Sequence, residues 1–126
     1  NPYNGMDVSD PEATFIPLLK AIAELDLAYL HVLDMGLSGL DTLAMVRGNN
    51  ATPLIVNNML TADTGRALIN AQRADAVSFG RAFIANPDLV ARIRSGAQLA
   101  KPDYTKLYVG EEQGYTDYPA LNTAVE

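Results

Sequence analysis

The sequence predicts an α/β fold built on a parallel β-sheet. Short apolar runs rich in strand-favouring residues alternate along the chain with segments that have the apolar spacing of helices. The resulting order is helix, strand, helix, strand, helix, strand, helix, which is typical of right-handed βαβ units. A sheet of only these strands would have two unpaired edges, which are a liability unless other chain covers them. Consecutive strand–helix units of this kind form one arc of an eight-stranded TIM-type β/α barrel, so we expect a fragment of such a barrel, incomplete by itself.

The first predicted helix begins at Asp10. Asp10 can cap this helix, Pro11 suits its first position, and Ser9 and Glu12 have the spacing of a capping box. Apolar residues follow at positions i, i+3, i+4 and i+7: Phe15, Leu18, Leu19 and Ile22. Pro17 removes one backbone hydrogen bond, so we expect a bend in the second turn. The preceding stretch NPYNG reads as the inside of a loop, which adds to the expectation of a fragment.

The predicted strands are apolar on both faces, which is typical of strands buried on both sides in a parallel sheet. They span residues 27–33, 52–58 and 75–80. His31 is the single histidine of the chain and lies inside the first strand. We interpret it as a hydrogen-bonded core residue rather than a catalytic one, because no nucleophile or metal partner lies at a telling spacing.

The helices that follow the strands carry their own boundary signals. Residues 40–48 predict a short helix that Gly48 ends, and residues 61–74 predict a longer one with Thr61 as its cap. After the last strand, Asn86 is the predicted cap of a helix whose first position is a proline. A glycine just past the end of this helix, Gly96, favours its termination there.

Residues 97–126 are predicted to form an irregular C-terminal tail. They contain proline and glycine breaks and four of the six tyrosines of the chain. Two of these phenols lie in the segment GYTDYP. One interpretation is that buried aromatic rings anchor the tail, and the other is that Tyr115 lines a ligand cavity.

Composition excludes several functional classes. The 126-residue chain has no cysteine, which excludes a disulfide scaffold and is compatible with a cytoplasmic protein. Its net charge of −6 and lack of a basic stripe argue against nucleic acid or an anionic membrane as partner. No apolar run approaches the ~20 residues of a membrane span, and no secretion leader is evident. Without cysteine or a second histidine no metal site is predicted, and no nucleophile elbow appears.

Two neighbouring strand ends carry residues suited to an anion. Ligands in α/β folds bind at the carboxyl ends of strands, where this sequence places Asn57-Asn58-Met59 and Gly80-Arg81. Asparagine tolerates the left-handed backbone region, and exposed N–H groups of a turn can bind phosphate. Glycine allows close approach of a ligand, and arginine binds phosphate oxygens in pairs. The alternative interpretation is that Gly80 serves a turn and Arg81 pairs with a surface carboxylate.

Several segments together resemble the old yellow enzyme family of flavin-dependent NAD(P)H oxidoreductases, the ene reductases. They are ADAVSFGRAFIANPDLVARIRSGAQL followed by YVGEEQGYTDYPAL, with LAYLHVLD and LIVNN earlier and in the family's order. The resemblance implies an eight-stranded β/α barrel that binds FMN, in which residues 1–126 are the C-terminal portion of a single domain. This chain would supply approximately strands six to eight of the barrel, together with their helices and the tail. In the family NAD(P)H reduces FMN, and reduced FMN transfers hydride to an activated alkene.

The resemblance also implies which residues bind the cofactor. Backbone N–H groups of Asn58 and Met59, with Gly80 and Arg81, would hold the FMN phosphate, and Tyr115 would form one wall of the substrate cavity. The family often has glycines where this chain has Asn58 and Met59.

The family's H-x-x-N or H-x-x-H substrate anchor and its proton-donor tyrosine are missing, so we assign no catalytic residue and expect the chain alone to be inactive. It would need the N-terminal part of the barrel, on another chain or through self-association. Two further hypotheses are another phosphate-binding barrel enzyme, of isomerase or aldolase type, and a non-catalytic α/β binding module.

Overall fold

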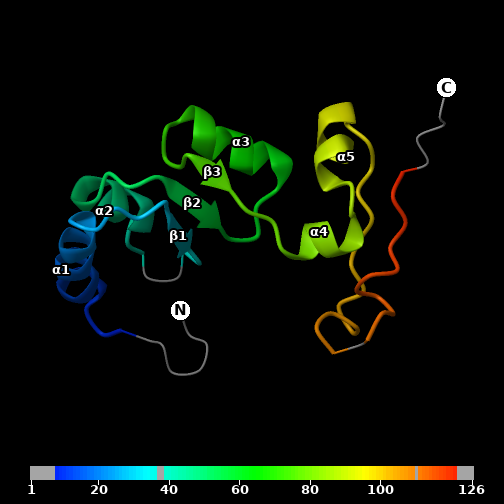
Figure 1. Cartoon of the computed structure of the whole chain (residues 1–126), viewed down its shortest axis with the longest axis horizontal. Coiled ribbons are helices and arrows are strands. Elements are labelled where there is room, and N and C mark those ends of the chain that lie inside the picture. The colour runs from blue at the N-terminus through cyan, green and yellow to red at the C-terminus, as the bar shows by residue number, and fades with distance from the viewer. Residues whose placement is uncertain (1–7, 37–38, 110, 122–126) are drawn as a thin grey trace. The chain divides into compact units, whose positions relative to one another are not determined.

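A computed structural model of the protein describes residues 8–36, 39–109 and 111–121. The chain divides into two compact units, residues 1–78 and residues 79–126, and each is described by itself (Figure 1). The first unit holds the β-sheet and its helices, and the second holds two short helices and the tail. Among the described residues, no helix is both long enough and apolar enough to cross a membrane.

The sheet of the first unit is parallel, as the sequence predicts. Strands β1 (Leu30–Leu33), β2 (Leu54–Asn57) and β3 (Ala76–Val77) lie in the order β1-β2-β3. β1 pairs with β2 from Leu30 opposite Leu54, and β3 pairs with the other side of β2. The strands are shorter than predicted, because the outer residues of the predicted segments lie in the loops that join the strands to the neighbouring helices.

Side-chain caps start the three helices of this unit. α1 (Pro11–Ala23) begins where Asp10 accepts a hydrogen bond from the N–H of Ala13, and it continues through its internal proline. α2 (Thr42–Asn49) has Asp41 in the same role. α3 (Ala62–Asn70) has a reciprocal capping box between Thr61 and Thr64. The caps at Asp10 and Thr61 are therefore confirmed.

The core of the first unit lies on one face of the sheet. Its buried apolar residues come from two helices, the middle strand and the turn before β3: Leu19, Leu43, Val46, Leu54, Val56 and Ala74. The described residues of this unit form no core on the opposite face, where Leu33 is 47% exposed. In this chain the strands are therefore buried on the face that the helices cover, and burial of the second face stays a prediction for the complete barrel.

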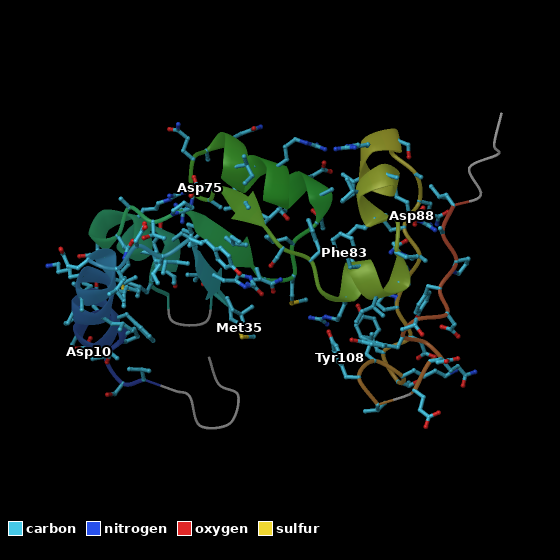
Figure 2. The ribbon with its side chains drawn as sticks, in the orientation of Figure 1. Asp10, Met35, Asp75, Phe83, Asp88 and Tyr108 are labelled. Carbon is cyan, nitrogen blue, oxygen red and sulfur yellow. The ribbon has the colours of Figure 1, made fainter. Side chains whose placement is uncertain are left out.

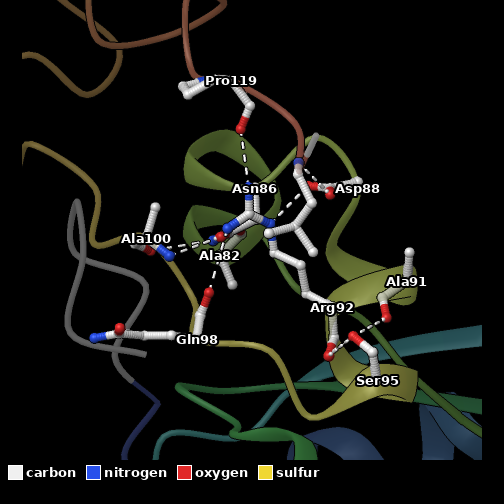
Figure 3. A network of polar contacts seen from close by, with 10 residues as sticks. Ala82, Asn86, Asp88, Ala91, Arg92, Ser95, Gln98, Ala100 and Pro119 are labelled. Carbon is white, nitrogen blue, oxygen red and sulfur yellow. Dashed lines mark hydrogen bonds and ion pairs between the residues drawn. The ribbon is translucent and has the colours of Figure 1, made fainter. Parts of the chain in front are cut away.

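The second unit contains a helix that the sequence does not predict, α4 (Arg81–Ala85), followed by α5 (Leu89–Ser95). Asn86 was expected to cap the last helix, but Asp88 occupies that position. The fully buried side chain of Asn86 instead bonds Ala82 and both polar groups of the Ala100 backbone (Figure 3). The end of α5 at Gly96 is confirmed, with a left-handed φ of 69°.

Arg92 ties the tail to this helix pair (Figure 3). Its Nε is 2.7 Å from Asp88, and its other nitrogens donate to the carbonyl oxygens of Gln98 and Pro119. Asp88 also accepts a 2.8 Å hydrogen bond from the N–H of Leu121. The described part of residues 97–121 has no helix or strand, and these polar bonds join it to the helix pair.

Candidate functional site

The carboxyl end of the middle strand presents backbone donors. β2 ends at Asn57, and in the described part of the first unit no acceptor takes the N–H of Asn58 or Met59. Met59 has a φ of 43°, in the left-handed region, and its side chain is 80% exposed. The left-handed residue is therefore Met59 rather than an asparagine. A non-glycine residue in this region is strained, which is frequent where a turn serves a ligand.

A polar cluster lies at the same end of the sheet. His31 Nε2 is 2.9 Å from Ser78 Oγ, and Asn57 Nδ2 donates to the Ser78 carbonyl at 2.9 Å. The predicted hydrogen bond of His31 is present, but the residue is exposed on the uncovered face rather than buried in a core. Sequence analysis missed the cluster, because its members meet only once the strands are in register.

In the second unit, the described residues do not account for the glycine at position 80. Gly80 has a negative φ of −91°, which other residues also adopt. A methyl group on Gly80 would lie 3.9 Å from Oη of Tyr108, an ordinary contact, and would meet nothing else within 4 Å. Neither backbone strain nor packing among the described residues therefore requires a glycine here.

Arg81 has no carboxylate partner in the described part of the second unit. Its guanidinium lies 5.8 Å from the centre of the Tyr104 ring, the geometry of a cation–π contact. This finding removes support from the alternative in which Arg81 pairs with a surface carboxylate. The charge of the side chain remains available to an anion.

The tyrosines of GYTDYP have different environments. The hydroxyl of Tyr118 accepts a 2.7 Å hydrogen bond from the N–H of Asp103 and so anchors the tail. Tyr115 is 41% exposed, and its ring lies 6.1 Å from the ring of Tyr108, centre to centre, in an edge-on arrangement (Tyr108 is labelled in Figure 2). The turn before Tyr115 needs its glycine, because a Cβ on Gly114 would lie 2.7 Å from the side chain of Lys106. Tyr118 thus fits the interpretation in which a tyrosine anchors the tail, and the partly exposed ring of Tyr115 fits the interpretation in which it lines a ligand cavity.

The carboxylates with perturbed acidity are structural. The N–H of Leu54 and the guanidinium of Arg47 hold the pKa of Asp75 below its usual value. The bond from Arg92 and the N–H of Leu121 do the same for the pKa of Asp88. These groups stay ionised at neutral pH and each already has a partner, so they are not suited to proton transfer. Among the described residues no group of three metal-ligating side chains comes together.

The predicted site residues divide between the units. Asn58 and Met59 belong to the first, and the second unit brings Gly80 and Arg81 together with the tail tyrosines. The sheet and its helices make this an α/β protein. Among its described residues it has open backbone donors at a strand end and an arginine without a carboxylate partner, which are groups suited to bind a phosphate.

Comparison with known proteins identifies the family. The profile of the NADH:flavin oxidoreductase / NADH oxidase family matches residues 8–100, and the chain belongs to this family. A 12-oxophytodienoate reductase-like protein of Solanum lycopersicum is 33% identical over 98% of this chain and 35% of its own length. A probable flavin mononucleotide-dependent alkene reductase of Leishmania infantum is 56% identical over 38% of this chain and 13% of its own length.

Solved structures agree with this assignment. The old yellow enzyme from Trypanosoma cruzi superposes with a TM-score of 0.82 at 40% identity, over 90% of this chain and 31% of that one. The chain thus spans about a third of the length of the relatives that match nearly all of it. The predicted family is confirmed, as are the cofactors expected of the family, FMN with NAD(P)H as reductant.

Proposed function

We propose that this chain forms strands six, seven and eight, their helices and the C-terminal tail of an eight-stranded β/α barrel. The parallel sheet, the family membership and the share of its relatives that the chain spans all support this assignment. Residues 1–126 are then the C-terminal portion of a single domain. The complete protein is an FMN-dependent NAD(P)H oxidoreductase that reduces activated C=C bonds, such as those of enones, which agrees with the name of the Leishmania relative.

The observation that carries this proposal is a set of anion donors without partners. Among the described residues of its unit, no group accepts the N–H of Asn58 or Met59, and none of the described carboxylates around Arg81 pairs with it. Gly80 leaves space that packing among the described residues of its unit does not explain. Backbone N–H groups and a guanidinium are the donors that proteins use for phosphate, so these residues fit the phosphate of FMN.

Bound FMN supplies hydride transfer from NAD(P)H to the electrophilic carbon of the alkene. The residues of this chain bind and orient the flavin, and Tyr115 forms one wall of the substrate cavity with a ring that the tail leaves 41% exposed. No catalytic residue is assigned to this chain. The isomerase, aldolase and binding-module alternatives lose their support, because the chain belongs to the NADH:flavin oxidoreductase / NADH oxidase family.

The uncovered face of the sheet indicates what else the barrel needs. Leu33 and His31 are exposed there, on the side opposite the helical core. In a closed β/α barrel the strand residues opposite the helices fill the interior. We therefore assign the uncovered face to the barrel interior, completed by an N-terminal portion or by self-association.

The test is flavin content and alkene reduction. The complete protein should purify yellow, release FMN on denaturation and oxidise NADPH or NADH with 2-cyclohexenone. The 126-residue chain of verified mass, with added FMN, should show no turnover, because it carries no assigned proton donor. A colourless complete protein that binds no flavin would contradict the proposed function. Robust turnover by the lone chain would contradict the proposal that this chain binds the flavin while the rest of the barrel supplies the proton donor.

A further inference from the structure

Side-chain hydrogen bonds join the carboxyl ends of the strands in the first unit. Nδ2 of Asn57, the last residue of β2, donates to the Ser78 carbonyl oxygen at 2.9 Å and lies 3.0 Å from its Oγ. The same Oγ lies 2.9 Å from Nε2 of His31 in β1. The three side chains therefore connect β1, β2 and the residue that follows β3.

These side chains share one face of the sheet. In a strand, residues two apart point to the same side. His31 is the register partner of Ile55, and Asn57 follows Ile55 by two residues. Ala76 is the partner of Ile55 on the other side, and Ser78 follows it by two residues. The cluster thus lies on the uncovered face, opposite the buried residues of β2.

A hydrogen bond from the Asn57 side-chain amide replaces the next backbone hydrogen bond that would join β2 to the segment after β3. The N–H of Ser78 donates to the carbonyl of Val56 at 3.0 Å. In a parallel ladder the next rung would run from the N–H of Asn58 to the carbonyl of Ser78. That carbonyl accepts from the Asn57 side chain instead, and the N–H of Asn58 stays outside the ladder.

We propose that Asn57, supported by Ser78 and His31, is a positioning residue that keeps the N–H of Asn58 available to the FMN phosphate. A carbonyl oxygen can accept two hydrogen bonds, so the Asn57 amide acts by direction: it holds the Ser78 carbonyl away from the N–H of Asn58, and the ladder ends before it uses this donor. The Ser78 hydroxyl, itself bonded to His31, holds the amide in the orientation that this requires. The inference rests on the proposed function, because it assigns a support to the proposed phosphate site.

The order of effects follows from the bonds. Asn57→Ala removes the amide and lets Asn58 pair with Ser78, so it should have the largest effect. Ser78→Ala removes the hydroxyl but keeps the carbonyl that Asn57 bonds, so its effect should be smaller. His31→Phe, which removes only the outer partner, should have the smallest effect.

The experiment measures the binding of two flavins and the hydrogen exchange of one backbone amide, both in the complete protein. Dissociation constants of FMN and of riboflavin, which lacks the phosphate, are measured by quenching of flavin fluorescence for wild type and Asn57→Ala. FMN binding should weaken about tenfold, as expected for one lost bond to a charged group, and riboflavin binding less than twofold. Hydrogen exchange of the Asn58 amide in the flavin-free protein should slow in the variant, because the amide joins the ladder.

A matched control separates positioning from stability. Asn49→Ala removes a similar bond, from Asn49 Nδ2 to the Met45 carbonyl at 2.8 Å, in α2 of the same unit. It should lower the melting temperature without changing the FMN-to-riboflavin ratio. Equal losses for both flavins in Asn57→Ala, or unchanged exchange of the Asn58 amide, would overturn the inference. A wild type that binds both flavins equally would instead refute the proposed phosphate site, whatever the exchange measurement shows.

Discussion

Each of the two units of the chain is stabilised internally by a different kind of interaction. In the first, apolar side chains of the helices and the middle strand form a core, and a parallel ladder joins the strands. In the second, which buries fewer apolar residues (Ala85, Leu89 and Leu107), two buried polar side chains, Asn86 and Arg92, bind helix ends and tail. A core of many apolar contacts spreads its stabilisation over many residues. A buried polar network depends on each member, because losing one leaves its partners unsatisfied.

The largest effect is expected from the polar network of the second unit. Arg92→Ala removes the ion pair to Asp88 and two bonds to tail carbonyls, and the Arg92 side chain is only 8% exposed. We expect the free energy of unfolding to fall by about 3 kcal/mol, because buried partners lose their donors. Urea unfolding of the complete protein measures it. Arg94→Ala, an exposed arginine of the same helix, is the control and should change stability by less than ~0.5 kcal/mol.

Within the first unit, the two faces of the sheet allow a second comparison, between a buried and an exposed leucine. Leu54 is fully buried in the core, so Leu54→Ala should destabilise the 126-residue chain by about 3 kcal/mol. Leu33 is 47% exposed, and Leu33→Ala should have an effect below ~1 kcal/mol in that chain. In the complete protein the same substitution should destabilise by about 2 kcal/mol, because the barrel interior then covers Leu33. Equal effects of Leu33→Ala in both settings would argue against the barrel assignment.

A smaller effect, the dependence of stability on pH, tests the polar network of the second unit. The bond from Arg92 and the N–H of Leu121 lower the pKa of Asp88 below its ordinary value of 3.8. A lowered carboxyl pKa stabilises the fold above the ordinary value, and this stabilisation is lost as the pH falls through the folded pKa. Melting temperatures between pH 5 and pH 2.5 should therefore fall less steeply for Asp88→Asn than for wild type. Asp63→Asn, in an exposed pair with Arg66, should keep the wild-type slope.

Local signals explain what could be predicted. The order of helices and strands, the parallel sheet, and the caps at Asp10 and Thr61 depend on apolar spacing and on residues within one turn. The features that sequence analysis missed depend on contacts between distant segments. Asn86 matches a helix cap in sequence, but its buried side chain bonds Ala100, fourteen residues further on. His31 meets Ser78 across 47 residues, and no local pattern indicates that pairing.

The candidate site shows the same division. The resemblance points to the strand ends at Asn58 and at Gly80, and the open N–H of Asn58 and the space at Gly80, both among the described residues, agree with it. The left-handed backbone of Met59 and the ring of Tyr104 beside Arg81 could not be predicted, because both arise from how turns and tail fold back.

The most direct test of the central claim is the flavin preference of Arg81→Ala in the complete protein. A charge-assisted bond to a partly buried phosphate contributes about 1.5–3 kcal/mol, so FMN binding should weaken about ten- to a hundredfold. Riboflavin binding should stay within about twofold, and Arg81→Lys should recover only part of the loss, because an ammonium cannot make the paired contact. Equal losses for FMN and riboflavin would contradict the account, because they would make Arg81 a structural residue of the turn.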